Sequence, residues 1–236
     1  MGYWQGGLVY FFYIHTTDST QDHGKAIATL HSTCVSFWVQ SAHQTQGRGQ
    51  RGRIWSSKEG NLFLTGCLPP SRKISPGRLS ITTGVSLLAI LQSLLPKQQE
   101  TLKLGLKWPN DVLLNQKKCA GILIEVSEYT FIGIGINIIS HPDNTPMPAT
   151  HLLADNSSIN QNKLIMKIIE TIPDFEKIEN FEDVRKLWWE FAKESVPYWH
   201  VREPLNGKVL GIDEQGQLLI LSENGDIIKR HQTFRE

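Results

Sequence analysis

The feature that most constrains the fold is a series of short apolar, strand-like runs with only short polar turns between them. These runs cover residues 102–108, 111–114, 120–126 and 130–139. Turns this short can join only antiparallel neighbours, because two parallel strands need a long crossover connection. This part of the chain is therefore predicted to form an antiparallel meander, not a repeat of strand–helix–strand units.

The segments on either side of the meander supply further strands and helices. Residues 8–15 are aromatic and β-branched and are expected to form a buried strand. Candidate N-caps at residues 16–20 precede a short helical segment, and Ser75-Pro76 is a typical start for a long helix. Strands are also expected at residues 34–40 and 62–68, and helices at residues 24–30 and 76–95.

The C-terminal part of the chain changes character near residue 198. Before it, two helices are expected, one lined by Leu164, Ile165, Ile168 and Ile169 and the other by Val184, Leu187, Trp188 and Phe191. After it come short strands at residues 207–212, 217–221 and 227–230, with a hairpin signal at Asn224-Gly225. We therefore expect an α+β protein with a main domain over residues 1–198 and a small β-barrel over residues 199–236 that leans on it.

Composition excludes several classes of protein. The 236 residues hold 24 Lys and Arg against 23 Asp and Glu, so a strongly basic nucleic-acid binder is not expected. The longest apolar stretch is too short to span a bilayer, and the N-terminal apolar run lacks the features of a secretory signal. Cys34, Cys67 and Cys119 are widely spaced, which argues against a disulfide framework or a zinc site. A reducing cytoplasm is the expected compartment.

The most distinctive motif is Gly-Arg-Gly-Gln-Arg-Gly-Arg at residues 47–53. Glycine lets backbone N–H groups approach an anion closely, and arginine adds planar, permanently charged donors. The motif thus predicts a mobile phosphate-binding loop. The alternatives are a solvated turn or an RNA contact, and RNA affinity would fall steeply with salt.

Two further clusters lie in the meander. Lys107 ends an apolar strand ahead of a Pro-Asn-Asp turn, so its ammonium needs a partner or a ligand. The alternative is a hairpin turn with a solvent-reaching lysine. Gly133 and Gly135, with Asn137, and Gly121 on the neighbouring strand mark places where a ligand or another backbone comes close, although ordinary sheet packing explains each one alone.

Motifs for other chemistries are missing from the sequence. It contains no H-E-x-x-H, no G-x-S-x-G nucleophile elbow and no P-loop. No fixed metal site of the protein is therefore expected.

Taken in order, these motifs resemble those of biotin protein ligases. The resemblance rests on residues 18–21, the loop at 47–53 followed by Trp55, residues 60–64, 107–111, 120–125 and 133–138, and it covers essentially the whole chain. It implies a mixed sheet flanked by helices, related to class II aminoacyl-tRNA synthetases, and an SH3-like C-terminal domain. The chain starts at the first catalytic strand, so it resembles members without a DNA-binding domain.

The resemblance also implies a two-step reaction. Biotin reacts with ATP, supplied with Mg²⁺, to give biotinyl-5′-AMP, and a lysine of a biotin carboxyl carrier protein domain then takes the biotin. Because the substrate brings its own nucleophile, the protein needs only to neutralise charge and position groups. No DNA or membrane partner is implied, and members are monomers or homodimers. The alternative within the superfamily is a lipoate–protein ligase.

Matching positions carry the implied site residues. Lys107, Arg48 and Arg51 are the implied catalytic residues. The implied biotin-binding residues are Ser19, Thr20, Gln21, Gln44, Arg48, Gly49, Gln50, Lys107, Gly121 and Gly135. The implied ATP-binding residues are Arg51, Arg53, Trp55, Asn110 and Asn137.

Three positions depart from the family pattern. Gln21 replaces the usual Asn, and His151 replaces the usual Ser in the segment Ala149-Thr150-His151-Leu152. Gln50 replaces the second Arg of the usual Gly-Arg-Gly-Arg, and a neutral amide cannot replace a guanidinium fork. Weaker retention of the adenylate is therefore predicted.

Overall fold

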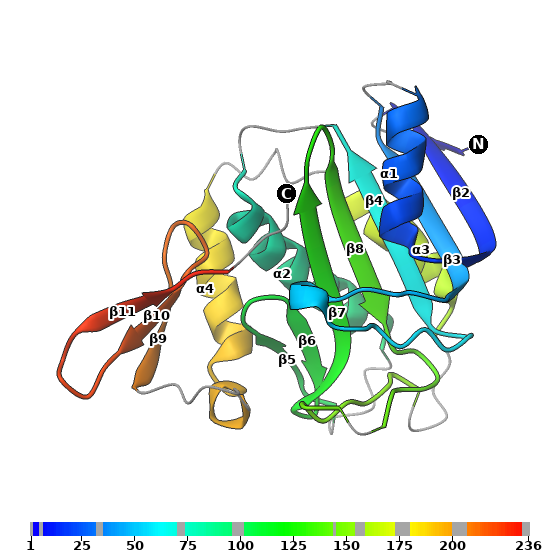
Figure 1. The fold of residues 1–236 in the computed structure, drawn as a ribbon. Coiled ribbons are helices and arrows are strands. Elements are labelled where there is room, and N and C mark those ends of the chain that lie inside the picture. The colour runs from blue at the N-terminus through cyan, green and yellow to red at the C-terminus, as the bar shows by residue number, and fades with distance from the viewer. Residues whose placement is uncertain are drawn as a thin grey trace.

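The computed structural model describes residues 2–4, 7–31, 35–69, 74–95, 102–143, 145–153, 159–172, 180–199 and 207–232 (Figure 1). The strands of its large sheet are β1 (Gly2–Trp4), β2 (Gly7–Thr17), β3 (Phe37–Gln44), β4 (Leu62–Leu68), β5 (Leu104–Lys107), β6 (Asp111–Leu114), β7 (Lys117–Val126) and β8 (Thr130–Ile136). The helices are α1 (Thr20–His31), α2 (Pro76–Leu94), α3 (Gln161–Thr171) and α4 (Phe181–Ala192).

The large sheet has the strand order β1-β2-β3-β4-β8-β7-β6-β5. Among the described strands of this sheet, β2 and β3 are the one parallel pair, and α1 makes the crossover between them. The strands from β5 to β8 form the expected antiparallel meander. The predicted mixed, largely antiparallel sheet of an α+β protein is therefore confirmed.

The expectation that the first strand is buried is wrong. In β2, the side chain of Phe11 is 43 % exposed and that of Tyr13 is 58 % exposed. β1 pairs only with residues 7–9, so the rest of β2 pairs with β3 alone among the described strands. An aromatic, β-branched composition suits a border strand as well as a buried one, and so the sequence could not separate the two.

The predicted strand at residues 34–40 is observed further along the chain. β3 begins at Phe37 because its parallel register starts with Tyr10 of β2 opposite Phe37, and it continues to Gln44. Cys34 lies outside the described residues.

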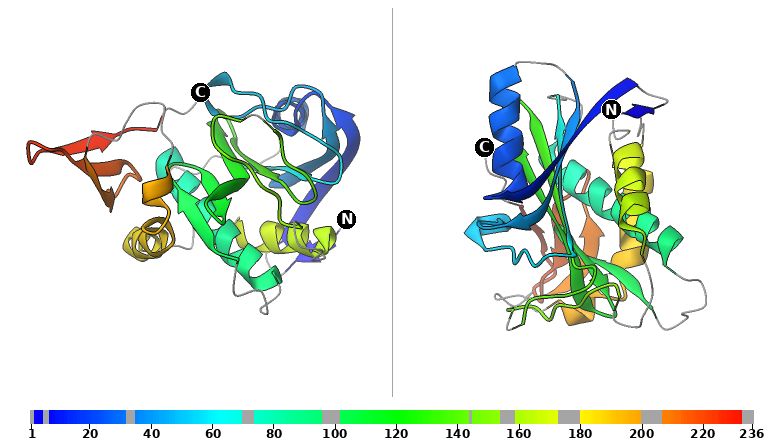
Figure 2. Two further views of the ribbon diagram at one scale, coloured as in Figure 1. Left: turned by 90° about the horizontal axis from the view of Figure 1, so that it is seen from below. Right: turned by 90° about the vertical axis from the view of Figure 1, so that its right-hand side faces the viewer.

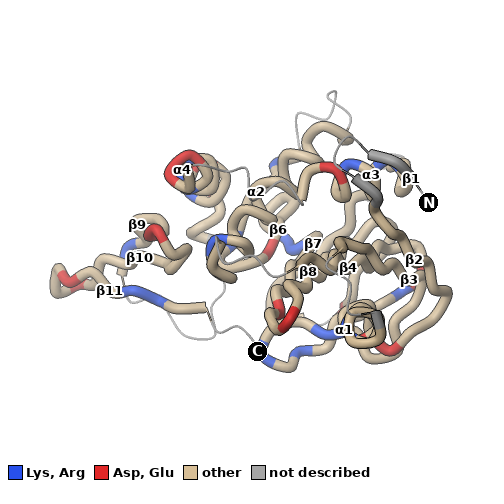
Figure 3. Tube along the Cα trace, turned by 90° about the horizontal axis from the view of Figure 1, so that it is seen from above, with Lys and Arg blue, Asp and Glu red and all other residues tan. Residues whose placement is uncertain are grey.

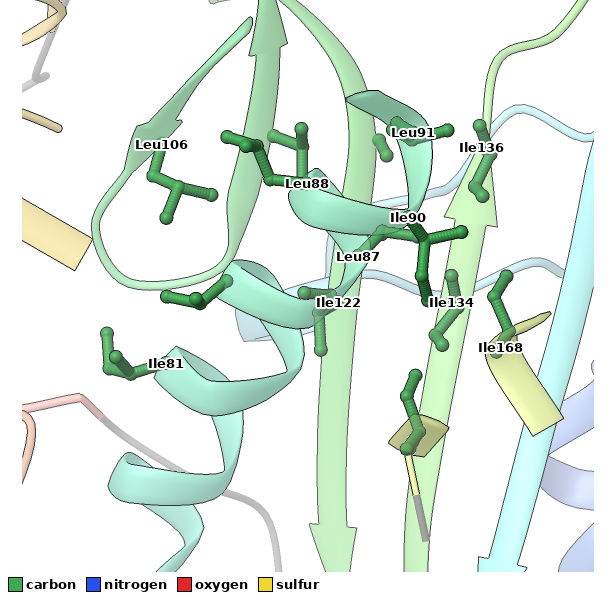
Figure 4. Packing of buried hydrophobic residues seen from close by; sticks show 14 of the residues in the cluster. Ile81, Leu87, Leu88, Ile90, Leu91, Leu106, Ile122, Ile134, Ile136 and Ile168 are labelled. Carbon is green, nitrogen blue, oxygen red and sulfur yellow. The ribbon is translucent and has the colours of Figure 1, made fainter. Parts of the chain in front are cut away.

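Helices cover both faces of the sheet (Figure 2). α1 packs on one face, over β3, β4 and β8, and α2, α3 and α4 lie on the other. Figure 4 shows how Leu87, Leu88 and Leu91 of α2 face Ile122 and Ile134 of the central strands, which forms the main core. Ser75 caps the N-terminus of α2 as its sequence suggests.

One residue of α4 does not take its predicted place. Val184 and Trp188 are buried, but Leu187 is 49 % exposed. The buried stripe of this helix follows the four-residue step from Val184 to Trp188 and on to Ala192, which leaves Leu187 on the outer face.

The C-terminal strands form a separate antiparallel sheet with the order β11-β10-β9. Its strands are β9 (Lys208–Ile212), β10 (Leu218–Leu221) and β11 (Ile227–Arg230). The hairpin predicted at Asn224-Gly225 joins β10 to β11, and Gly225 has the positive φ of +85° that such turns need. Residues 200–206 and 233–236 lie outside the described chain, so the domain boundary near residue 198 and the closure of a barrel stay predictions.

Candidate active site

A cavity of about 1020 Å³ is lined by the basic loop at residues 48–53 and by the start of α1. Its volume is at the upper end of the usual range for small-molecule sites. Fifteen residues that the sequence marks as site candidates, drawn from separate motifs, line this one cavity. They are Ser19, Thr20, Gln21, Gln44, Arg48, Gly49, Gln50, Arg51, Arg53, Trp55, Lys107, Asn110, Gly121, Gly135 and Asn137.

The start of α1 forms a wall of neutral polar groups. The backbone N–H and the hydroxyl of Thr20 both donate to Oε1 of Gln44, at 2.8 and 3.1 Å, and Thr65 donates to the hydroxyl of Thr20 at 2.8 Å. Gln44 in turn donates from Nε2 to Ser57 at 3.0 Å. This buried network fixes the end of β3 to the start of α1, so that the wall is rigid.

Gln21 is a lining residue whose side-chain oxygen is buried beside the cavity. Its Nε2 donates to the carbonyl oxygen of Leu123 at 2.9 Å, but its buried Oε1 has no hydrogen-bond partner among the described residues. The amide lies directly over Gly133, where a Cβ would come within 2.7 Å of Nε2. A buried acceptor without a donor is costly, which suits a site where a ligand supplies the missing N–H.

The Gly/Arg motif folds as a short hairpin-like loop. Gly49 donates to the carbonyl of Arg53, and Trp55 donates to the carbonyl of Gly47, each at 2.8 Å. The tip is a 3₁₀ turn at residues 50–52, in which Arg51 has a φ of +57°. Arg51 and Arg53 are exposed at this tip, and both line the cavity.

Arg48 is held at the base of this loop. Its Nη2 lies 2.7 Å from Oδ1 of Asp22 on α1 and 3.1 Å from Oε2 of Glu125 on β7. Glu125 is only 2 % exposed and also pairs with Lys25 at 3.3 Å. These contacts show Arg48 tying the loop to a helix and a strand.

Trp55 covers the glycines that were expected to admit a ligand. Gly121 and Gly135 are direct partners across β7 and β8. A Cβ at Gly135 would lie 2.5 Å from the Trp55 indole, and one at Gly121 would lie 2.8 Å from it. The two glycines therefore form a flat floor that accepts an aromatic ring in close contact.

Two ammonium groups lie near the end of β5 and the start of β7. Burial lowers the pKa of the Lys107 ammonium; the carboxylate of Asp111 raises it, and the charges of Lys118 and Arg53 lower it. Lys107 also lies 3.2 Å from Sδ of Met147. An ammonium partly out of solvent attracts a nearby anion more strongly than one in water, although burial also makes its charged form less favourable.

Lys118 is a cavity residue that the sequence analysis missed. Its Nζ lies 2.6 Å from Oδ1 of Asp111 and 5.2 Å from the centre of the Trp55 ring. It also lies 3.1 Å from the position of a Cβ on Gly121. In the sequence it is one of two adjacent lysines in an ordinary turn, and only the pairing of β6 with β7 brings it to the cavity.

The two asparagines hold the backbone around the cavity. Asn110 donates to the carbonyl of Ile122 at 2.6 Å, and Asn137 donates to that of Thr150 at 3.0 Å. The end of β11 and the two residues after it also reach the cavity, which the sequence analysis did not foresee. The lining residues there are Lys229, Arg230, His231 and Gln232.

The lining is strongly cationic. Asp111 carries the only carboxylate among the described lining residues. The cationic ones are Arg48, Arg51, Arg53, Lys107, Lys118, Lys229 and Arg230. Basic and acidic residues are interspersed along the rest of the trace in Figure 3, so this excess is local and predicts an anionic ligand.

The two described cysteines are remote from thiolate chemistry. Cys67 and Cys119 are free and buried, and burial raises the pKa of both thiols, that of Cys119 to about 12. No group of three or more His, Cys, Asp or Glu side chains in the described chain could hold a metal ion. None of the described helices is long and apolar enough to cross a membrane.

The fold and the cavity together define an α+β domain with a cation-lined cavity between a sheet and a basic loop, which suits an anionic small molecule. The chain belongs to the biotin/lipoate A/B protein ligase family, whose model matches residues 8–138. This family is the one that the sequence motifs indicated.

Known proteins similar to the chain are biotin ligases. It is 31 % identical over 209 residues to the bifunctional ligase/repressor BirA of Bacillus subtilis, covering 79 % of this chain and 62 % of that protein. It is 37 % identical over 134 residues to the biotin–[acetyl-CoA-carboxylase] ligase of Paracoccus denitrificans, covering 54 % of each. The chain thus spans less than two thirds of the length of these relatives.

A solved structure extends the similarity over almost the whole chain. It is the biotin protein ligase from Aquifex aeolicus in complex with biotin and ATP, with a TM-score of 0.74 and 26 % identity. The match covers 93 % of this chain and 94 % of that one.

Proposed function

We propose that this chain is an ATP-dependent biotin–protein ligase. In the first step a biotin carboxylate oxygen bonds to the α-phosphorus of ATP, supplied as its Mg²⁺ complex, and the bond to the β-phosphate oxygen breaks to release pyrophosphate. In the second step a lysine amine of an acceptor protein bonds to the activated carbonyl carbon, AMP leaves and the amine loses a proton. The observation that carries the proposal is that motifs far apart in the sequence converge on one cation-lined cavity.

The neutral wall suits the ring end of biotin. The ureido group of biotin carries two N–H donors and one carbonyl acceptor. The unpaired Oε1 of Gln21 can accept one of these N–H groups, which would remove the cost of its burial. Ser19, Thr20 and Gln44 complete the polar surface around it.

The cationic groups suit the reacting end. Two anions must meet in the first step, so their repulsion is the main barrier. Lys107 and Lys118 would neutralise the carboxylate and the α-phosphate, and Arg51 and Arg53 would reach the phosphates from the loop tip. Arg48, held by two carboxylates, would contribute through the position of the loop.

The indole ring of Trp55 suits the nucleoside part of ATP. Trp55, lying over Gly121 and Gly135, offers a ring on which adenine can stack. Asn110 and Asn137 would contribute polar contacts on this side. A protein nucleophile is unnecessary, since the biotin carboxylate and then the acceptor amine attack.

The similar proteins and the cysteines support an acceptor protein and a cellular compartment for this reaction. We propose a biotin carboxyl carrier domain as acceptor, supported by the carboxylase named for the Paracoccus denitrificans relative. The use of ATP and the free thiols of Cys67 and Cys119 support the cytoplasm as the compartment.

Exchange of labelled pyrophosphate into ATP tests the reaction. We expect biotin-dependent exchange, with a loss of at least tenfold in Lys107→Ala and in Lys118→Ala, because each removes a cation from the reacting end. Lys186→Ala, on the outer face of α4, is the matched control and should keep wild-type exchange. Exchange that depends on lipoate and not on biotin would favour the alternative acid, and no exchange with either acid would reject the proposal.

A further inference from the structure

The side chain of Met147 lies against the ammonium group of Lys107. Sδ of Met147 is 3.2 Å from Nζ of Lys107, and the sulfur accepts a hydrogen bond from this ammonium. Both side chains are half-buried, and both line the cavity. A cation at the reacting end of the site is therefore in contact with an uncharged, polarisable sulfur.

The backbone around Met147 is fixed independently of this contact. The N–H of Lys118 donates to the carbonyl of Pro148 at 2.8 Å, and that of Thr150 donates to the carbonyl of Lys118 at 2.9 Å. The hydroxyl of Thr145 donates to the carbonyl of Met147 itself at 2.6 Å. These bonds pair the segment with the start of β7, so the thioether is held beside the end of β5 by the protein alone.

The charges that act on Lys107 come from other parts of the chain. Burial lowers the pKa of its ammonium most; Asp111, at the start of β6, raises it, and Lys118 and Arg53 lower it. The carboxylate of Asp111 contacts Lys118 directly, at 2.6 Å. The segment from Thr145 to Ala149 carries no charged side chain. The other titratable groups among the described lining residues are Arg48, Arg51, Lys229, Arg230 and His231.

We propose that Met147 is a positioning residue, whose thioether directs the Lys107 ammonium into the cavity without cancelling its charge. A carboxylate in this place would also hold the ammonium, but it would neutralise it and repel the incoming anions. A thioether accepts an N–H bond and has no net charge, so the positive charge remains for the ligand. The inference rests on the proposed function for the identity of these anions, the biotin carboxylate and the α-phosphate.

Three substitutions of Met147 separate the orientation of Lys107 from its charge. Met147→Leu keeps the volume and removes the acceptor, Met147→Gln keeps a neutral acceptor, and Met147→Glu supplies a charged one. Met166→Leu is the matched control, since Met166 is 40 % exposed on α3. It should change neither of the two readouts below, because its side chain is absent from the cavity lining.

The titration of Lys107 tests the contact without a ligand. Trace acetylation of the full chain over a range of pH, followed by mass spectrometry of the peptide that contains Lys107, gives the pH at which this amine becomes reactive. We expect a lower midpoint in Met147→Leu, because a bond to the charged form is lost, and a higher one in Met147→Glu, because a carboxylate favours that form. Met147→Gln should stay close to wild type. One common midpoint for wild type, Met147→Leu and Met147→Glu would overturn the inference.

Biotin-dependent pyrophosphate exchange gives the second readout. At pH 7.5 we expect kcat to fall about fivefold in Met147→Leu, as for the loss of one hydrogen bond, and at least tenfold in Met147→Glu, which cancels the charge. Met147→Gln should restore most of the rate. The alkaline decline of the rate should move to lower pH in Met147→Leu and to higher pH in Met147→Glu, which a general loss of stability does not explain. Slower exchange with the same alkaline decline in both variants would contradict the positioning role.

The two readouts also separate this inference from the proposed function. If wild type shows no biotin-dependent exchange but the Lys107 titration shifts as expected in the Met147 variants, the proposed function is rejected and the positioning of Lys107 by Met147 is supported. If exchange is normal and the titration does not respond to Met147, the inference is rejected and the proposed function is supported.

Discussion

Residue 50 is the position at which the cavity departs most in charge from the family pattern. Gln50 lies at the tip of the loop and lines the cavity, next to the exposed guanidinium of Arg51. Asp111, the carboxylate of the cavity, is paired with Lys118. The loop therefore brings less positive charge to a bound adenylate than one with arginine at this position.

Gln50→Arg should retain the intermediate better. A charged hydrogen bond contributes about 1.5–3 kcal/mol, so release of biotinyl-5′-AMP from preloaded protein should slow roughly tenfold or more. The measurement is the rate at which labelled adenylate leaves the protein after dilution. Gln46→Arg adds the same charge at an exposed residue outside the cavity lining and should have little effect. Equal release from wild type and Gln50→Arg would reject this account of residue 50.

The lowered pKa of Lys107 predicts an alkaline limit to activity. Its ammonium is the form that neutralises the reacting anions, and it is lost as the pH rises through a pKa below the usual lysine value. Biotin-dependent pyrophosphate exchange should therefore fall at a lower pH than an ordinary lysine would cause. In Lys107→Arg this decline should move to higher pH, since arginine stays charged. Lys186→Arg is the control, and an unchanged alkaline limb in Lys107→Arg would argue against the role of Lys107.

Residues with strong local signals could be placed from the sequence, and others could not. Glycine-rich and Pro-Asn turns constrain the backbone where they stand, which is why the loop and the residues around Lys107 were found. Lys118 has no such signal, because its place depends on the pairing of β6 with β7. Lys229 and Arg230 come from the second sheet, and their arrival at the cavity depends on how the two sheets pack.

At the scale of elements, the basic loop depends on a helix and a strand for its position. Asp22 of α1 and Glu125 of β7 both hold Arg48, and Glu125 also holds Lys25. Because Glu125 is almost completely buried, its charge is supported by these two cations. This group of four charges is the structural base of the loop.

Glu125→Gln should loosen that base. A buried amide cannot satisfy two cations, so the free energy of unfolding should fall by about 1–3 kcal/mol. Trypsin should also cleave after Arg51 or Arg53 faster than in wild type, because the loop opens more often. Chemical denaturation and timed digestion of the full chain measure the two effects.

Glu182→Gln is the matched control for a surface pair. Glu182 pairs with Arg185 one turn along α4 and is 46 % exposed, so its loss should cost at most about 1 kcal/mol and leave cleavage of the loop unchanged. Equal stability losses in the two variants would show that the pairs of Glu125 are no stronger than an ordinary surface contact.

The periodicity of apolar residues predicted which segments are helices and which are strands. It did not predict how exposed β2 is or where β3 begins. The spacing of apolar residues predicted α2 and the meander because it reports which face of each element is buried. The start of β3 depends on its parallel register with β2, and the exposure of β2 depends on how little β1 covers it. Both are properties of the assembled sheet and have no local sequence signal.

At the scale of the whole molecule, the C-terminal sheet is joined to the main core. Val209, Ile212, Leu218 and Ile220 belong to the same cluster of buried residues as α2 and α4. Trp108 donates from its indole to the carbonyl of Gly216 at 2.9 Å, which adds a polar link beside the cavity. The sequence predicted that this part leans on the rest from its small size, but the contacts could be assigned only from the structure.

This shared core predicts that both sheets unfold together. Ile220→Ala removes a side chain that is 2 % exposed, so it should lower the free energy of unfolding by about 2–5 kcal/mol. Because the cluster spans both sheets, the tryptophan fluorescence, to which the buried Trp38 and Trp188 of the main core contribute, and the backbone circular dichroism should follow one transition. Ile228→Ala, at the position opposite Ile220 on β11 and 44 % exposed, should cost clearly less. An early transition seen by circular dichroism alone would show instead that the C-terminal strands unfold as an independent unit.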